Sequence, residues 1–298
     1  MLADQAELQP KAFTQRIAER ARELGTHIGL EIEADPYRHP LTHPDRFDGD
    51  PAKAARALVH YFQAIFEATG PLVASYTIAS AGFERLGIPG MVALAQLLAD
   101  LRGAGIPVIL DGKRSDLGTA AEAYADAYLG EAVFAADAVT VTPWLGFDSL
   151  GPFVSAARKD GRGVVVVLKS ANAGSGDIQN LRLPGGEPVW ERIAGRLDEL
   201  SEQNLDGRGF SPVIASVAGT RDELQRAREL LPGTLVLVPA VDSRNENVAD
   251  VSPVFAEGGL AIVNASGNLA YTSEDYDFPV RTREALLQFR DAINELRD

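Results

Sequence analysis

The chain alternates short apolar runs, rich in Val and Ile, with longer stretches that have the apolar spacing of amphipathic helices. This alternation is typical of βα units whose strands pair in a parallel sheet. The candidate strands are residues 27–33, 72–79, 107–113, 137–144, 163–171, 212–219, 234–241 and 260–266. Helices are expected over residues 51–69, 90–103, 187–204, 221–231 and 279–298, with a further one near 11–24.

This count of strands favours one fold over its nearest competitor. We expect an α/β fold, a TIM (β/α)8 barrel that forms a single domain over residues 1–298, with the helix at about 11–24 covering the barrel floor. A doubly wound open sheet would show the same alternation. It is disfavoured because LEIEADP (30–36) follows the first strand in place of the GxGxxG fingerprint of dinucleotide-binding sheets.

Composition excludes several classes of function. The formal net charge of -14 disfavours nucleic acid and anionic membrane surfaces as partners, and any anionic small-molecule substrate would need a locally positive pocket. The absence of cysteine excludes disulfides, thiolate metal sites and cysteine nucleophiles. The charged first residues lack the apolar core of a signal peptide, so we expect a cytoplasmic protein.

The third predicted strand ends in alternating charge, in the segment VILDGKRSDLG (108–118). Side chains alternate along a strand, so Asp111 and Lys113 should project on the same side, and Asp116 follows in the loop. A lysine between carboxylates stays protonated and can donate a proton to a carbon on which negative charge develops. The alternative is a set of surface ion pairs, with Asp116 capping the helix that begins near Leu117.

LDGKRSDLG resembles the DxKxxD signature of the orotidine 5′-phosphate decarboxylase family. TVTPWLGFDSLGPF (140–153) resembles the segment after the fourth strand in the longer bacterial and archaeal branch of that family. Further similar segments follow in order through most of the chain: VVVVLKSANAG (164–174), SVAGTRDEL (216–224), LVLVPAV (235–241) and IVNAS (262–266).

The resemblance implies a decarboxylase of pyrimidine nucleotide metabolism that needs no metal or cofactor and forms a homodimer with shared active sites. Asp111 would lie against the substrate carboxylate, and Lys113 would protonate the carbon that CO₂ leaves. Asp116 would reach into the neighbouring subunit's site. Two alternatives stay open: a Mg²⁺-dependent sugar-phosphate decarboxylase or lyase of the same superfamily, which uses a similar motif, and a catalytically inactive binding barrel.

Several positions that hold substrate in the family differ here. Glu31 replaces the aspartate expected near the ribose, unless an insertion makes Asp35 its equivalent. Thr77 stands where the family has a lysine on the second strand. Ala120 replaces a threonine that contacts the ribose, with Thr119 beside it.

The segments after the fifth, seventh and eighth strands differ as well. SANAG (170–174) keeps Asn172 but loses a serine expected to contact the pyrimidine. In the phosphate region Asp242 replaces a glycine, and Gly267 stands where an arginine is expected. Arg244 occupies a glutamine position and could supply the missing charge.

The resemblance thus gives a catalytic set, Asp111, Lys113 and Asp116, and a substrate-binding set, Glu31, Thr77, Thr119, Asn172, Arg244, Asn264 and Ser266. Changed contacts beside an intact catalytic motif favour the hypothesis of the same chemistry on a related carboxylate, with another sugar or without the 5′-phosphate. Orotidine monophosphate itself is the other candidate substrate.

Three remaining signals carry less weight. RHPLTHPDRF (38–47) contains two histidines, but its prolines and spacing disfavour a metal site. Lys169 ends the fifth strand and would permit a Schiff-base mechanism, which the flanking similarity to the decarboxylases disfavours. The long Gly-rich loop over residues 173–188 is a candidate lid.

Overall fold

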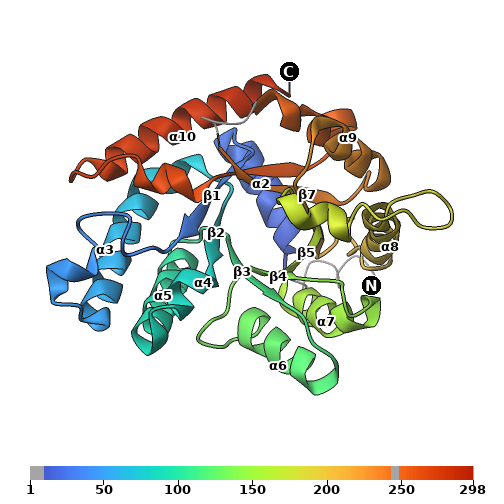
Figure 1. Ribbon diagram of the computed structural model, residues 1–298. Coiled ribbons are helices and arrows are strands. Elements are labelled where there is room, and N and C mark those ends of the chain that lie inside the picture. The colour runs from blue at the N-terminus through green and yellow to red at the C-terminus, as the bar shows by residue number, and fades with distance from the viewer. Residues whose placement is uncertain (1–9, 243–247, 298) are drawn as a thin grey trace.

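A computed structural model describes residues 10–242 and 248–297, and its parallel strands close into a barrel in the order β1 to β8 (Figure 1). The strands are β1 (Ile28–Glu33), β2 (Ser75–Ala79), β3 (Val108–Arg114), β4 (Ala138–Val141), β5 (Gly163–Lys169), β6 (Val213–Val217), β7 (Leu235–Val241) and β8 (Ala261–Ala265). The predicted TIM barrel is confirmed, and each predicted strand is present with its ends shifted by at most a few residues.

Helices cover the outer face of the sheet (Figure 1), apart from the first of them, which packs against the inward-facing strand residues. They are α2 (Phe13–Leu24), α3 (Pro51–Thr69), α4 (Ser80–Glu84), α5 (Gly87–Gly103), α6 (Gly118–Leu129), α7 (Gly151–Asp160), α8 (Val189–Gln203), α9 (Arg221–Leu230) and α10 (Phe278–Glu295). The start of helix α3 follows from the local sequence. The Asp50 carboxylate caps the helix by accepting from the N–H groups of Ala52 and Lys53, and Pro51 suits the first turn. No helix among the described residues combines the length and the hydropathy that a membrane crossing needs.

The apolar core has two parts. The larger part lies between the sheet and the surrounding helices. The smaller part fills the inside of the barrel, where Phe13 and Ile17 of α2 pack against inward-facing strand residues: Ala74, Ile109, Ala138, Val165, Ile214, Leu235, Leu237 and Ile262. Most of these strand residues lie in the N-terminal halves of their strands, so apolar side chains occupy that end and polar groups can gather at the other.

The extent of one domain over residues 1–298 stays a prediction. The helix expected near 11–24 corresponds to α2 (Phe13–Leu24), and its Phe13 and Ile17 side chains are only 1% exposed.

Candidate active site

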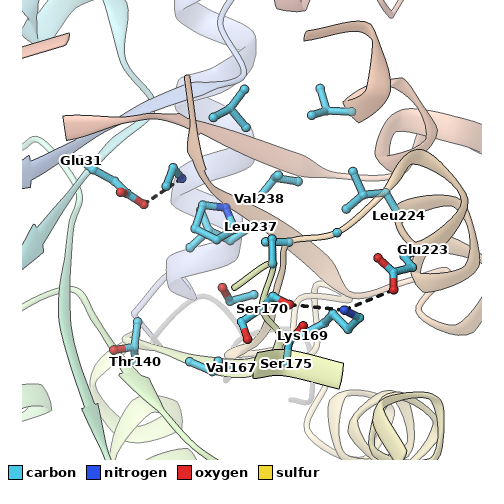
Figure 2. A pocket seen from close by; sticks show the side chains of 18 of the residues that line it. Glu31, Thr140, Val167, Lys169, Ser170, Ser175, Glu223, Leu224, Leu237 and Val238 are labelled. Carbon is cyan, nitrogen blue, oxygen red and sulfur yellow. Dashed lines mark hydrogen bonds and ion pairs between the residues drawn. The ribbon is translucent and has the colours of Figure 1, made fainter. Parts of the chain in front are cut away.

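A cavity of about 960 Å³ opens at the C-terminal ends of the strands (Figure 2). In TIM barrels this end carries the chemistry, because rigid strands position the side chains that the following loops surround. Among the described residues, the charged groups that line the cavity are the carboxylates of Glu31, Glu33, Asp111, Glu223 and Asp250 and the ammonium groups of Lys113 and Lys169. Carboxylates therefore outnumber cations around this space.

The end of β3 forms a hydrogen-bonded group with Thr140 of β4. Lys113 Nζ lies 2.5 Å from Asp111 Oδ2, and the Thr140 hydroxyl donates to Asp111 Oδ1 at 2.7 Å. The same Thr140 oxygen accepts from the Lys113 backbone N–H at 2.8 Å. One buried hydroxyl thus fixes both the carboxylate and the backbone of the lysine.

An irregularity in β3 makes this arrangement possible. The register between β3 and β4 shifts between Leu110 and Arg114, and Lys113 has a φ of 45°. A non-glycine residue in this left-handed region is uncommon and persists when its surroundings hold it, here through the bond to Thr140. Asp111 and Lys113 meet on one side, as predicted, but through a bulge rather than through regular strand alternation.

The other two charged residues of the motif, Arg114 and Asp116, make their contacts away from the Asp111–Lys113 pair. Asp116 accepts from the backbone N–H of Leu117 at 2.8 Å. Arg114 turns away from the cavity to pair with Glu84 at 2.8 Å and to donate to the Tyr128 hydroxyl. The Lys113 side chain is 58% exposed and the Asp111 side chain 21%, so the pair lies at the mouth of the cavity.

Glu31 faces Asp111 from β1 and is paired in register with Thr77 of β2. It accepts from the Ala240 N–H at 3.0 Å, while Thr77 accepts from Asn264 Nδ2 at 2.8 Å. Burial, together with the charges of Asp111 and Glu33, raises the pKa of Glu31 to about 7. At neutral pH this carboxyl is therefore only partly ionised.

The remaining predicted binding residues are dispersed. Asn172 is exposed and accepts from the Ser170 hydroxyl at 2.7 Å. Ser266 is buried and accepts from the Asn268 N–H, and Thr119 is exposed on α6, outside the cavity lining. Arg244 lies outside the described residues. The structure brings Glu31, Thr77, Asp111 and Lys113 together, with Asn264 directly beneath Thr77.

The region expected to hold phosphate is acidic in this chain. A Cβ atom added to Gly267 would lie 3.0 Å from Glu33 Cγ, so the Glu33 side chain would have to shift by a few tenths of an ångström to admit a larger residue there. Asp242 is buried and accepts from Asn268 Nδ2 at 3.3 Å. Across residues 10–242 and 248–297, Cys, His, Asp and Glu side chains form no group of three or more that could hold a metal ion.

Two features of the cavity were missed by the sequence analysis. Thr140 was noted only as part of a similar segment, although its polar side chain between Val139 and Val141 indicates an inward-facing position on β4. The pairing of Lys169 with Glu223, at 3.2 Å, joins residues far apart in the sequence, and no local pattern reveals it. Lysine nucleophiles are activated in apolar pockets or beside a second cation, and the pairing of Lys169 with Glu223 provides neither, which argues against the Schiff-base alternative.

Comparison with known proteins supports the resemblance seen in the sequence. Residues 54–268 match the family model described as "Orotidine 5'-phosphate decarboxylase / HUMPS family". An orotidine 5′-phosphate decarboxylase of Rhodopirellula baltica is 36% identical over 275 residues, covering 90% of each chain. One of Deinococcus radiodurans is 36% identical over 286 residues, covering 95% of this chain and 97% of that protein.

Solved structures agree with the fold. A crystal structure from Streptomyces avermitilis matches with a TM-score of 0.79 at 25% identity, covering 97% of each chain. The structure of Leishmania donovani OMP decarboxylase matches with a TM-score of 0.75 at 27% identity, covering 96% of this chain and 98% of that one. These names give no support to the altered substrate favoured by the sequence analysis, nor to the Mg²⁺-dependent alternative. With the family model and bacterial relatives matching most of its length, the chain belongs to the orotidine 5′-phosphate decarboxylase / HUMPS family.

Proposed function

We propose that the chain is a carboxy-lyase of pyrimidine nucleotide metabolism that decarboxylates orotidine 5′-phosphate without a metal or cofactor. The observation that carries the proposal is the Lys113 ammonium, 2.5 Å from Asp111 at the mouth of the barrel cavity. Relatives that share 36% of their residues with this chain carry the name of that activity.

Lys113 is proposed as the proton donor. When the bond between the ring carbon and the carboxylate breaks, CO₂ leaves and the electron pair stays on the carbon. A proton then moves from Lys113 Nζ to that carbon, which leaves a neutral amine that solvent protonates again. Asp111 holds the Lys113 side chain in position before the reaction through their 2.5 Å contact, so the donor is already oriented when negative charge develops on the carbon.

A homodimer would complete the site. Asp116 is followed by Leu117, which is 52% exposed, and the loop after the neighbouring strand β4 exposes Trp144 by 67% and Leu145 by 45%. Exposed apolar groups of this size mark interaction surfaces. We propose that this face pairs with a second copy and that Asp116 then contacts the partner's cavity. The cytoplasmic localisation stays a prediction.

A second candidate substrate is a related carboxylate that lacks the 5′-phosphate. The observation that favours it is Glu33, which lies against Gly267 where a phosphate-binding arginine is expected. A carboxylate in that place repels a phosphate dianion. An inactive binding barrel is less consistent with relatives that carry the name of a decarboxylase.

Replacing Lys113 by alanine is expected to lower kcat for CO₂ release from orotidine 5′-phosphate by about 10²–10⁴-fold, because the proton donor is lost. Release of CO₂ is measured with and without a chelator, and thermal melting checks the fold. Lys53→Ala, at an exposed lysine of α3, is the control and should retain full activity. Unchanged turnover in Lys113→Ala would refute the role, and loss of activity on chelation would favour the Mg²⁺-dependent alternative.

Mixing two inactive variants tests the shared site. Lys113→Ala and Asp116→Asn proteins, unfolded together and refolded, should recover about a quarter of wild-type activity, because half of the random dimers contain one intact site. Each variant refolded alone is the control and should remain inactive. No recovery, with heterodimers present by mass spectrometry, would place Asp116 in the site of its own chain.

The raised pKa of Glu31 predicts a pH dependence of stability. The folded chain holds a proton on Glu31 that the unfolded chain has released, so the free energy of unfolding should fall as pH rises from about 4.5 to about 7. The fall due to this group is at most about 3 kcal/mol. Urea unfolding of Glu31→Gln alongside wild type isolates it, because the variant should lack this decline. Parallel curves for the two proteins would contradict the assignment.

Replacing Glu33 by glutamine removes a carboxylate beside Gly267, and should raise kcat/KM for orotidine 5′-phosphate by roughly threefold to tenfold. Orotidine, which has no phosphate, is the matched substrate and should be turned over by both proteins at the same rate. If wild type prefers orotidine to its 5′-phosphate, the second candidate is correct. An equal effect of Glu33→Gln on both compounds would show that Glu33 does not act on the phosphate.

A further inference from the structure

Lys169 is a buried charge in the cavity that the proposed reaction does not use. It ends β5, is 3% exposed and lines the same cavity as Asp111 and Lys113. Figure 2 shows Lys169 and Glu223 turned toward each other, apart from Glu31. Burying an ammonium group costs free energy even when it is paired, so the presence of a buried lysine in this cavity needs a physical explanation.

The Lys169 ammonium is rigidly held. Its Nζ lies 3.2 Å from Glu223 Oε1 and donates to the Ser170 carbonyl at 3.3 Å. The other Glu223 oxygen accepts from the Thr220 N–H at 2.8 Å, within the capping box that begins α9. An ammonium has three N–H donors, and these contacts use two of them. The third is available to a group in the cavity.

The charge of this pair restricts what that group can be. Lys169 and Glu223 together are neutral, so they attract a dianion weakly, and the Glu223 carboxylate would repel a phosphate. A neutral carbonyl oxygen needs only the one N–H donor. The pair therefore suits a carbonyl acceptor better than a phosphate.

The barrel geometry decides which part of the substrate lies here. In the closed order β1 to β8, strand β5 lies opposite β1, and β3 lies midway between them on one side. The family resemblance implies a sugar near Glu31 of β1, and the proposed function places the reacting carbon near Lys113 of β3. The edge of the base that points away from the sugar then faces β5. One of the two ring carbonyls of the base lies on that edge.

We propose that Lys169 is a substrate-positioning and specificity-determining residue, which donates a hydrogen bond to the ring carbonyl on the edge of the base away from the sugar. This inference rests on the proposed function. It also accounts for the loss of the serine expected to contact the pyrimidine, since Ala171 follows Lys169 by two residues and lines the same cavity.

Two nucleotides that differ at this edge test the inference by binding alone. Uridine 5′-phosphate presents a carbonyl acceptor there, and cytidine 5′-phosphate presents an amino donor. Wild type should bind the uridine nucleotide at least about tenfold more tightly, because an ammonium cannot accept from an amino group. In Lys169→Met this ratio should fall to within about threefold, through weaker binding of the uridine nucleotide, as measured by titration calorimetry.

Matched variants separate recognition from structure. Lys169→Met/Glu223→Gln avoids leaving a carboxylate unpaired and should also lose the ratio, whereas Glu223→Gln alone keeps the ammonium and should retain it. With orotidine 5′-phosphate, Lys169→Met should raise KM by at least about tenfold and lower kcat far less than Lys113→Ala does.

The outcomes distinguish this inference from the proposed function. A wild-type protein that binds neither nucleotide and releases no CO₂ from orotidine 5′-phosphate would overturn the proposed function and the inference with it. A wild-type protein that is active, with a binding ratio unchanged in Lys169→Met, would overturn the role of Lys169 alone. Equal weakening of both nucleotides with a lowered melting temperature would show a structural role and would also overturn it.

Discussion

The geometry of the Asp111–Lys113 pair depends on one side chain, the hydroxyl of Thr140. It donates to Asp111 and accepts from the backbone N–H of Lys113, so β4 holds the carboxylate and the left-handed backbone at the end of β3. Without that acceptor, the Lys113 N–H at the bulge would lose its partner, and the positive φ would lose its compensation. The orientation of the Lys113 side chain therefore depends on contacts between β3 and β4, and not on the motif of β3 alone.

Neutral ion pairs and additional carboxylates occupy different sides of the cavity. The Asp111–Lys113 and Lys169–Glu223 pairs are each neutral, while Glu31 and Glu33 add carboxylates on the side formed by β1. Burial and these neighbours hold Glu31 partly protonated near neutral pH, which relieves the repulsion that three ionised carboxylates would create. A proton on Glu31 of β1 thus lowers the negative charge of the site, beside Thr77 of β2, which carries no charge.

Membership of the family and departure from its binding residues are compatible, because they concern different residues around the rim of the barrel. The Asp111–Lys113 pair and the segment after β4 keep the family pattern, and the barrel superimposes on solved relatives over nearly its whole length. The departures lie on β1 and β2 and in the segments after β3, β5, β7 and β8, where Glu33 approaches Gly267. A barrel permits this separation, since each strand contributes its own loop to the rim and one side can change without moving the other.

The sequence by itself determined the barrel, because alternation of apolar runs with amphipathic stretches is a local property that strand and helix periodicity record directly. It also predicted that Asp111 and Lys113 lie together, because they are two residues apart at the end of one predicted strand. Only the tertiary structure decided which distant residues meet around the cavity: Thr140 against Lys113, Glu223 against Lys169, and Glu33 against Gly267. Such contacts arise from strand register and from the packing of loops around the rim, and neither is encoded in the spacing of residues along the chain.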